Sequence, residues 1–239
     1  MNRKKIHLMH PNWGAFFLPG SRLTTYDSRL SPRMGRFLEA ACLIVYASGG
    51  AIKEVIEVMT EHNTRFNYIS KTPKELDVYL NKYVEILKEL DQYDSKTGEL
   101  VGTKTNLIIG VLDRLSILNR NTYMELMLQQ GVENNVDLVE EFQKNQLIVV
   151  EIPEAMFSTQ EERDVMVTYW ATKIWYALQL RSVKYKGNLK QLNLVIDEIY
   201  QVPNCEIFLT KKISQAAKFG FKPIISCHYI KQLKYMRDE

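Results

Sequence analysis

Two adjacent carboxylates, Asp197 and Glu198, stand directly after the apolar stretch of residues 192–196. This stretch predicts a strand in the core of a sheet, and ligands of open α/β sheets bind where the strands end. There an aspartate can hold Mg²⁺ through its water shell, and a following glutamate can polarise a water molecule that attacks a phosphate. The pair therefore predicts a Walker B site for a magnesium nucleotide, with two exposed acids that merely begin a loop as the simpler interpretation.

Two further polar side chains are predicted beside this pair. A helix is expected from about residue 207 to residue 218, followed by a strand at residues 223–227. Neighbouring parallel strands end at the same edge of a sheet, so Ser226 and His228 should reach the edge that carries Glu198. A polar group there can sense the γ-phosphate and report its hydrolysis.

The elements that position these residues are predicted within residues 146–239. Residues 147–152 form a β-branched run ended by Pro153, as expected of a buried strand. Residues 158–161 read as a capping box that opens a buried helix, and a basic linker of residues 181–190 leads to the strand at 192–196. Strand, helix, strand, helix, strand is typical of a parallel sheet covered by helices, so the fold class is α/β.

Residues 31–145 are expected to form a largely α-helical subdomain with no catalytic cluster. The sequence Thr72-Pro73-Lys74-Glu75 reads as a capping box before an apolar stripe, which predicts one helix of about 20 residues. Gly49 and Gly50 read as a helix break. Shorter helices are predicted at residues 35–47, 51–62, 104–118, 122–130 and 136–144.

These blocks resemble the FtsK/HerA superfamily of P-loop motor ATPases, nearest to the conjugation and type IV secretion (TraG/VirB-like) ATPases of mobile elements and phages. Residues 147–153, 194–203 and 217–228 carry the resemblance, which covers about residues 146–233. It implies part of a RecA/HerA-like parallel sheet with flanking helices, into which the helical subdomain is inserted. Residues 1–30 would then contribute a strand plus a loop of the ATPase core.

The resemblance also implies roles, cofactors and partners. Asp197 corresponds to the Mg²⁺-associated aspartate and Glu198 to the catalytic glutamate, with Ser226 beside the nucleotide. His228 stands where many members have a glutamine sensor. ATP and Mg²⁺ are the implied cofactors, and DNA or a secreted substrate is the implied cargo of a homohexameric ring. Zonula-occludens-toxin-like phage assembly ATPases share the acidic strand end and the later strand.

The sequence departs from the family in two places. Residues 216–218 read Ala-Ala-Lys where members commonly have Ala-Arg-Lys, so an arginine acting in trans is not assigned. No P-loop, GxxxxGK[S/T], is present, because none of the 11 glycines is followed by lysine.

The missing P-loop sets the expected activity. The chain carries the Walker B half only and should hydrolyse little or no ATP alone, either as the C-terminal piece of a longer ATPase or as a degenerate relative. The alternative from another class is a non-catalytic helical interaction module on a degenerate NTPase scaffold.

Composition sets broader limits. With 46% hydrophobic and 25% charged residues, the 239-residue chain is an ordinary globular protein, which excludes disordered and mini-protein classes. Three scattered cysteines without a CxxC pair favour the cytoplasm as the location of the protein. Partner proteins are expected to hold the assembly at the inner face of the membrane. No membrane span is expected, since the longest uncharged run, residues 40–52, is far below the required length of about 20 residues.

Charge is unevenly distributed along the chain. Residues 1–36 hold seven Lys/Arg against one Asp, residues 184–239 hold ten against five acids, and the middle holds fourteen against twenty-two. Basic ends can form a nucleic-acid face, and scattered surface lysines are the simpler interpretation.

Overall fold

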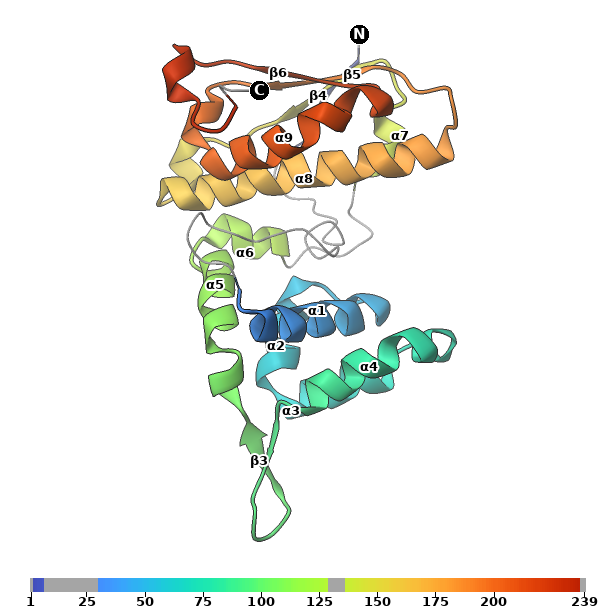
Figure 1. Cartoon of the computed structure of the whole chain (residues 1–239), viewed down its shortest axis with the longest axis vertical. Coiled ribbons are helices and arrows are strands. Elements are labelled where there is room, and N and C mark those ends of the chain that lie inside the picture. The colour runs from blue at the N-terminus through green and yellow to red at the C-terminus, as the bar shows by residue number, and fades with distance from the viewer. Residues whose placement is uncertain (1, 7–29, 129–135, 237–239) are drawn as a thin grey trace. The chain divides into compact units, whose positions relative to one another are not determined.

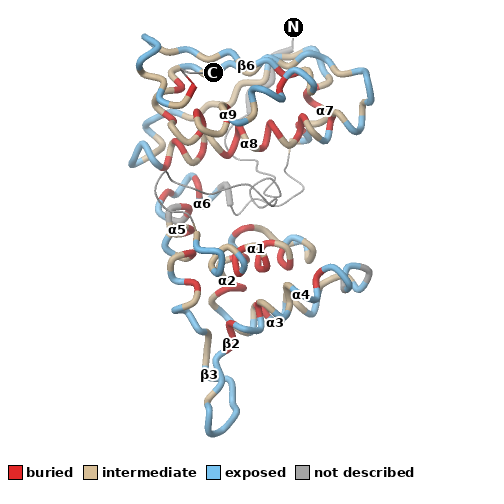
Figure 2. The backbone as a smooth tube through the Cα atoms, in the orientation of Figure 1, coloured by how far each residue is buried: buried red, intermediate tan, exposed pale blue. Residues whose placement is uncertain are grey.

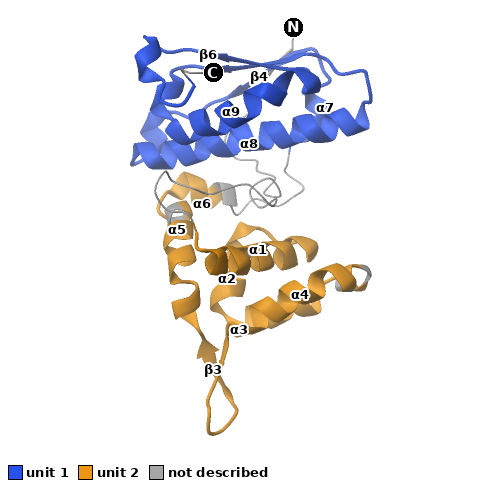
Figure 3. Ribbon diagram, viewed as in Figure 1, with its two compact units in different colours: residues 1–16, 21–27, 132–239 blue, residues 17–20, 28–131 orange. Residues whose placement is uncertain are grey.

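The chain is a mixed α/β protein that divides into two compact units. The structure is a computed structural model that describes residues 2–6, 30–128 and 136–236 (Figure 1). Residues 1–16, 21–27 and 132–239 form one unit, here called the α/β unit, and residues 17–20 and 28–131 form the other, called the helical unit (Figure 3). Most of the N-terminal segment predicted at residues 1–30 lies outside the described residues.

Two pairs of parallel strands belong to the α/β unit. Strand β1 (Asn2–Ile6) pairs with β4 (Gln146–Val150), and β5 (Leu192–Ile196) pairs with β6 (Phe221–Ile225). The strand predicted at residues 192–196 is confirmed. The single sheet predicted for β4, β5 and β6 is wrong for the part of the chain that is described, because β4 is hydrogen-bonded to β1 alone. An apolar run identifies a strand, whereas its partner is chosen by the tertiary fold.

The long helix of this unit is α8 (Gln160–Lys184). Thr159 caps it by accepting from the Glu162 amide, and the Glu162 carboxylate accepts from the Ser158 amide (3.0 Å). The N-cap therefore lies one residue later than predicted, and the returning carboxylate binds the amide before the N-cap residue, so the predicted capping box is not formed. Helix α8 also continues into the linker predicted at residues 181–190, since the buried Arg181 donates to the carbonyls of Phe142 (3.0 Å) and Phe219 (2.9 Å).

Helix α9 (Pro203–Ala216) packs with α8 along one side of β5 and β6 (Figure 1). Their shared core contains Ala171, Ile199, Val202, Cys205, Leu209 and Met236, with Ile196 and Ile225 packed against it. Trp170 and Trp175 of α8 are buried and pack in the interior of this unit.

The opposite face of β5 and β6 is open. The cross-strand pair Val195 and Ile224 is 67% and 44% exposed. The prediction of a strand in the core of a sheet is therefore wrong, because only one face of the strand is covered. Short helices complete this unit: α7 (Leu138–Glu141) and the 3-10 turns Glu154–Met156, Ile199–Gln201, Ala217–Phe219 and Ile230–Gln232.

The helical unit is built around α1 (Pro32–Ala47), whose buried residues are Phe37, Leu38, Ala40, Ala41, Cys42, Ile44 and Val45 (Figure 2). Ser31 caps α1, and the helix ends before Gly49, which has a φ of +77° and confirms the predicted break. The other helices are α2 (Ile52–Thr60), α3 (His62–Ser70), α4 (Asp77–Lys88), α5 (Ile109–Asn119) and α6 (Thr122–Leu128), with 3-10 turns at Lys74–Leu76 and Thr105–Leu107.

Two helix predictions for this unit are wrong. The helix of about 20 residues is only α4, which begins five residues after Thr72, because the Thr72 hydroxyl donates to the carbonyl of Tyr68 (3.3 Å) at the end of α3. The helix predicted at residues 51–62 stops at Glu61, whose backbone is extended, and α3 follows as a separate helix.

A β-hairpin also interrupts the predicted helical region. Strand β2 (Asp91–Tyr93) pairs antiparallel with β3 (Leu100–Thr103), and the Asp94 carboxylate closes the turn by accepting from the amides of Lys96 and Thr97. Its strands are too short to show a period of two in the sequence. Among the described helices, none is both long and apolar enough to cross a membrane.

Candidate active site

The ends of β5 and β6 bring the predicted site residues together. Past the last strand residues, the Ser226 amide donates to the Ile196 carbonyl (3.0 Å) and the Ile199 amide donates to the Ser226 carbonyl (3.3 Å). This continued pairing places Asp197 and Glu198 beside Ser226 and His228. We call these four residues the acidic edge.

Ser226 connects the Asp197 carboxylate to the backbone of Glu198. Its hydroxyl donates to Asp197 Oδ1 and accepts from the Glu198 amide (3.1 Å). One hydroxyl therefore orients the Asp197 carboxylate and the peptide bond between the two acids. Asp197 and Ser226 are both exposed and share the open face of the strands with Val195 and Ile224.

The Glu198 carboxylate is engaged through both oxygens. His228 Nε2 lies 3.0 Å from Oε1, which also accepts from the Tyr200 hydroxyl (3.4 Å), and the Gln201 amide donates to Oε2. Gln232 accepts from the His228 amide (2.9 Å) and so fixes the backbone that carries the imidazole. The contact between Glu198 and His228 becomes an ion pair when the imidazole is protonated.

The backbone of Glu198 is in the left-handed helical region, with φ 51° and ψ 47°. It is the one non-glycine residue with positive φ in the described part of the chain. Such a conformation costs about 1 kcal/mol and persists only where the surroundings enforce it. The turn after β5 is therefore a place where local strain accompanies a cluster of polar side chains.

The sequence interpretation missed a second layer behind Glu198. Arg163 on α8 donates to the side-chain oxygen of Gln201 (2.8 Å), and Gln160 donates to the Gln201 carbonyl (2.7 Å). Both the side-chain amide and the backbone carbonyl of Gln201 are therefore held in place while the side chain donates to Glu198. A signal was present in the sequence, because Arg163 is a cation in the first turns of a helix, where the dipole disfavours it.

Asp164, the next residue of α8, positions the helix that follows the acidic edge. It accepts from the backbone amide (2.9 Å) and side-chain amide (2.7 Å) of Asn204 and from the Cys205 amide (3.3 Å), at the start of α9. Burial raises the pKa of Asp164, and these hydrogen bonds oppose that shift. Asp164 thus acts as the N-terminal cap of α9 from a neighbouring helix.

The acidic edge fits one part of a magnesium nucleotide. Carboxylate and hydroxyl oxygens are the ligands that Mg²⁺ prefers, and the ion commonly keeps several waters. The described residues contain no group of three or more His, Cys, Asp or Glu able to hold a metal. In a Walker B site, Asp197 would contact Mg²⁺ through water. The triphosphate does not fit, because the 239 residues contain no P-loop sequence that would wrap it.

Comparison of this chain with protein-family models, curated proteins and solved structures finds no match.

Proposed function

We propose that this chain carries the Walker B half of an ATP-driven motor of the FtsK/HerA type, on part of a RecA/HerA-like P-loop NTPase fold. The supporting observation is the convergence of Asp197, Glu198, Ser226 and His228 at the ends of two parallel strands. Mg²⁺-ATP, when bound, supplies the electrophilic γ-phosphorus and the charge that the acidic residues complement.

Each residue of the acidic edge has a task in this proposal. Asp197 would hold Mg²⁺ through its water shell, and the Ser226 hydroxyl keeps the Asp197 carboxylate oriented. Glu198 would be the base for the attacking water when a nucleotide is bound. His228 and Gln201 hold Glu198 until a nucleotide arrives, because both of its oxygens are engaged by them and by Tyr200.

The open face of β5 and β6 supports the same proposal. Parallel strands are normally buried on both faces, whereas the face that carries Asp197 and Ser226 leaves Val195 and Ile224 exposed. In this proposal, a nucleotide and a phosphate-binding loop supplied by a longer polypeptide would cover this exposed face. The cargo of the parent assembly, a homo-oligomeric ring, would be DNA or a secreted protein.

The first test is metal binding by the chain itself. Mn²⁺ is a paramagnetic substitute for Mg²⁺, so it should broaden the amide NMR signals of residues 196–198 and 225–228, and excess Mg²⁺ should reverse the broadening. Asp197→Asn should abolish this local effect. Asp113→Asn, an exposed acid on α5, is the matched control and should leave it unchanged. If Mn²⁺ broadens the same amide signals to the same extent in Asp197→Asn, the assignment of the metal site is overturned.

The second test concerns turnover. If the DNA upstream of the Met1 codon encodes an in-frame GxxxxGK[S/T] segment, the extended polypeptide should hydrolyse ATP with Mg²⁺, and Glu198→Gln should reduce kcat by more than about 100-fold. Ser226→Ala should have a smaller effect, since it disturbs orientation alone. An extended protein whose turnover is unaffected by Glu198→Gln contradicts the motor proposal.

A second candidate is a non-catalytic interaction module. The observation in its favour is the exposure of Val78 and Tyr79 on α4, beside a pocket of about 500 Å³ lined by Ile69, Leu80 and Val84. In that case the sheet is scaffold, so Glu198→Gln leaves partner binding intact while Val78→Asp weakens it. Co-purification of both variants with partners of the native protein separates the two functions.

A further inference from the structure

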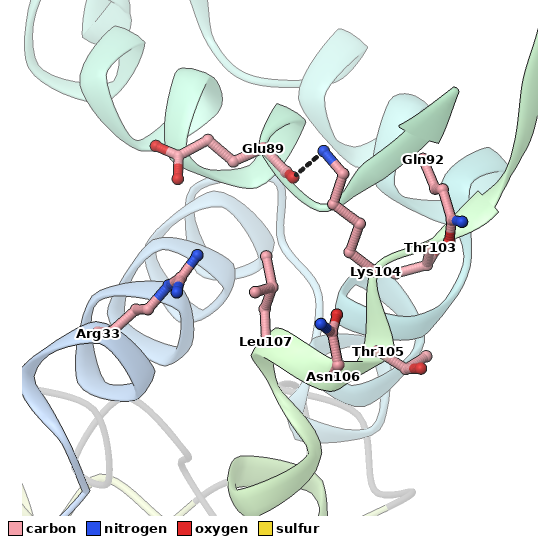
Figure 4. A pocket seen from close by; sticks show the side chains of 8 residues that line it. All are labelled: Arg33, Glu89, Gln92, Thr103, Lys104, Thr105, Asn106 and Leu107. Atoms are coloured by element: carbon pink, nitrogen blue, oxygen red, sulfur yellow. Dashed lines mark hydrogen bonds between the residues drawn. The ribbon is translucent and has the colours of Figure 1, made fainter. Parts of the chain in front are cut away.

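A polar pocket of about 650 Å³ lies in the helical unit, on elements that the proposed ATPase chemistry does not use. Figure 4 shows Arg33 at the start of α1 on one wall and Lys104, just after β3, on the opposite wall. Leu107 lies between them, and Asn106 and Thr105 add polar groups. We call this the basic pocket.

The cations of the basic pocket exceed its anions. Among the described residues that line the pocket, Glu89 is the one acid, and Arg36 neutralises it through a contact of 2.5 Å to Oε2. Lys104 donates to the main-chain carbonyl of Glu89 (3.1 Å), not to its carboxylate (Figure 4). Arg33 is exposed and has no hydrogen bond or ion pair among the described residues. Within the described part of the chain, the charges of Arg33 and Lys104 therefore have no counter-ion.

The position of the arginines is unfavourable for the helix itself. Arg33 and Arg36 lie in the first turns of the 16-residue helix α1, which has no acidic residue in its first turn. The positive end of the helix dipole repels cations there by about 0.3–1 kcal/mol each. Ser31 already caps the helix, so Arg33 contributes nothing to the described fold that would offset this cost.

We propose that the basic pocket binds phosphate oxyanions carried on an extended polyanion, either a nucleic-acid strand or a polyphosphate chain. The guanidinium of Arg33 and the ammonium of Lys104 pair with phosphates, and Asn106 and Thr105 donate hydrogen bonds. Because these cations are exposed, a single small anion gains little from them, whereas a polyanion gains the free energy of released counter-ions. This site is independent of the acidic edge.

The test uses the full chain and fluorescence anisotropy with a labelled single-stranded DNA at several salt concentrations. Arg33→Gln and Lys104→Gln should each raise Kd about 3–10-fold, and should each reduce the slope of log K against log salt by about 0.7. Lys53→Gln, an exposed cation of the same unit on α2, is the matched control and should do neither.

Unlabelled tripolyphosphate and inorganic phosphate separate the two sources. Direct DNA binding that depends on Arg33 supports a nucleic-acid strand. If DNA does not bind but tripolyphosphate does, by calorimetry and with the same dependence on Arg33, the ligand is a polyphosphate. Binding of neither polyanion, or equal losses in Lys53→Gln and Arg33→Gln, overturns the proposal.

Two controls keep the test decisive. Lys104 also bonds the Glu89 carbonyl, so a folding defect in Lys104→Gln is checked by circular dichroism, and Arg33→Gln, at an exposed residue, carries the test if one appears. Asp197→Asn should leave polyanion binding unchanged. Failure here therefore does not count against the ATPase proposal, nor does failure of that proposal count against the basic pocket.

Discussion

Charged residues serve opposite purposes in the two units. In the helical unit, Arg65 and Asp91 are 1% and 5% exposed, and the guanidinium donates to Asp91 Oδ1 (2.6 and 3.0 Å), to Thr103 Oγ1 (3.1 Å) and to the Val58 carbonyl (2.7 Å). In the α/β unit, the acidic edge is open to solvent and its glutamate has a strained backbone. The first arrangement joins the hairpin to α2 and α3, and the second leaves polar atoms available to a ligand.

The difference shows how burial separates structural from functional charge. A buried ion pair is kept only if its hydrogen bonds are satisfied within the protein, as those of Arg65 are. The ion pair and hydrogen bonds of an exposed cluster contribute little to stability. The free-energy cost of the positive φ at Glu198 is therefore not offset by burial of its side chain. We therefore expect substitutions at the first cluster to change folding and substitutions at the second to change binding.

The largest expected effect is at the buried pair. Arg65→Met leaves the Asp91 carboxylate buried with the His62 imidazole (2.9 Å) as its neighbour, and should cost about 3–5 kcal/mol of unfolding free energy. Hydrogen exchange of residues 91–103, followed by mass spectrometry, should rise accordingly. The double variant Arg65→Met/Asp91→Leu should recover most of the loss, and a double variant as unstable as the single one would contradict this explanation.

The next effect concerns Lys173, a lysine that is buried in the α/β unit. It shows that this unit also buries an ionisable side chain, as the helical unit does with Arg65 and Asp91. Burial lowers the pKa of Lys173 to about 7, beside the rings of Tyr169 and Trp170. The unfolded chain keeps this proton until about pH 10, so it binds more protons than the folded chain between about pH 7 and 10, and stability should rise with pH across that window.

Lys173→Met should remove this rise. The gain in wild-type stability from pH 7 to pH 10, measured by tryptophan fluorescence in urea, should exceed that of the variant by about 2–4 kcal/mol. Lys212→Met removes the same charge from a residue over Trp175 and should keep the wild-type pH dependence. A parallel pH profile for wild type and Lys173→Met argues against a neutral buried lysine.

A smaller effect is expected at Asp164. Asp164→Ala leaves the Asn204 and Cys205 amides without their acceptor and should cost about 1–2 kcal/mol, as loss of a helix cap does. Thermal unfolding of the α/β unit would measure this. Glu161→Ala, an exposed acid one turn earlier, should change stability by less than half as much, and equal losses would show that Asp164 is not a cap.

The smallest effect has the opposite sign. Glu198→Gly removes the strain of a side chain at positive φ and should stabilise the α/β unit by about 0.5–1 kcal/mol. The same substitution removes the contact between the Glu198 carboxylate and His228. Glu154→Gly, at an exposed position with ordinary backbone geometry, should destabilise slightly. A stability loss at Glu198→Gly equal to that at Glu154→Gly would show that Glu198 is not strained.

The sequence located the acidic edge because local signals carry it. The apolar run before Asp197 and the run before Ser226 both form strands, and parallel pairing brings their ends together. The left-handed conformation of Glu198 and the exposure of one strand face had no local signal. The support of Gln201 by Arg163 joins the turn after β5 to α8, and its one local signal was the position of Arg163 in the first turns of that helix.

By itself, the sequence determined the strand at residues 192–196, the long buried helix α8, the end of a helix at Gly49 and the polar residues that follow β5 and β6. Periodicity, caps and apolar runs are local, so they can be read in order along the chain. The tertiary structure alone decided that β4 pairs with β1, that Arg181 is buried in a helix and that a hairpin is joined to the helical unit by Arg65 and Asp91. These outcomes depend on which distant groups satisfy one another's hydrogen bonds and charges, and that choice is made only when the chain is packed.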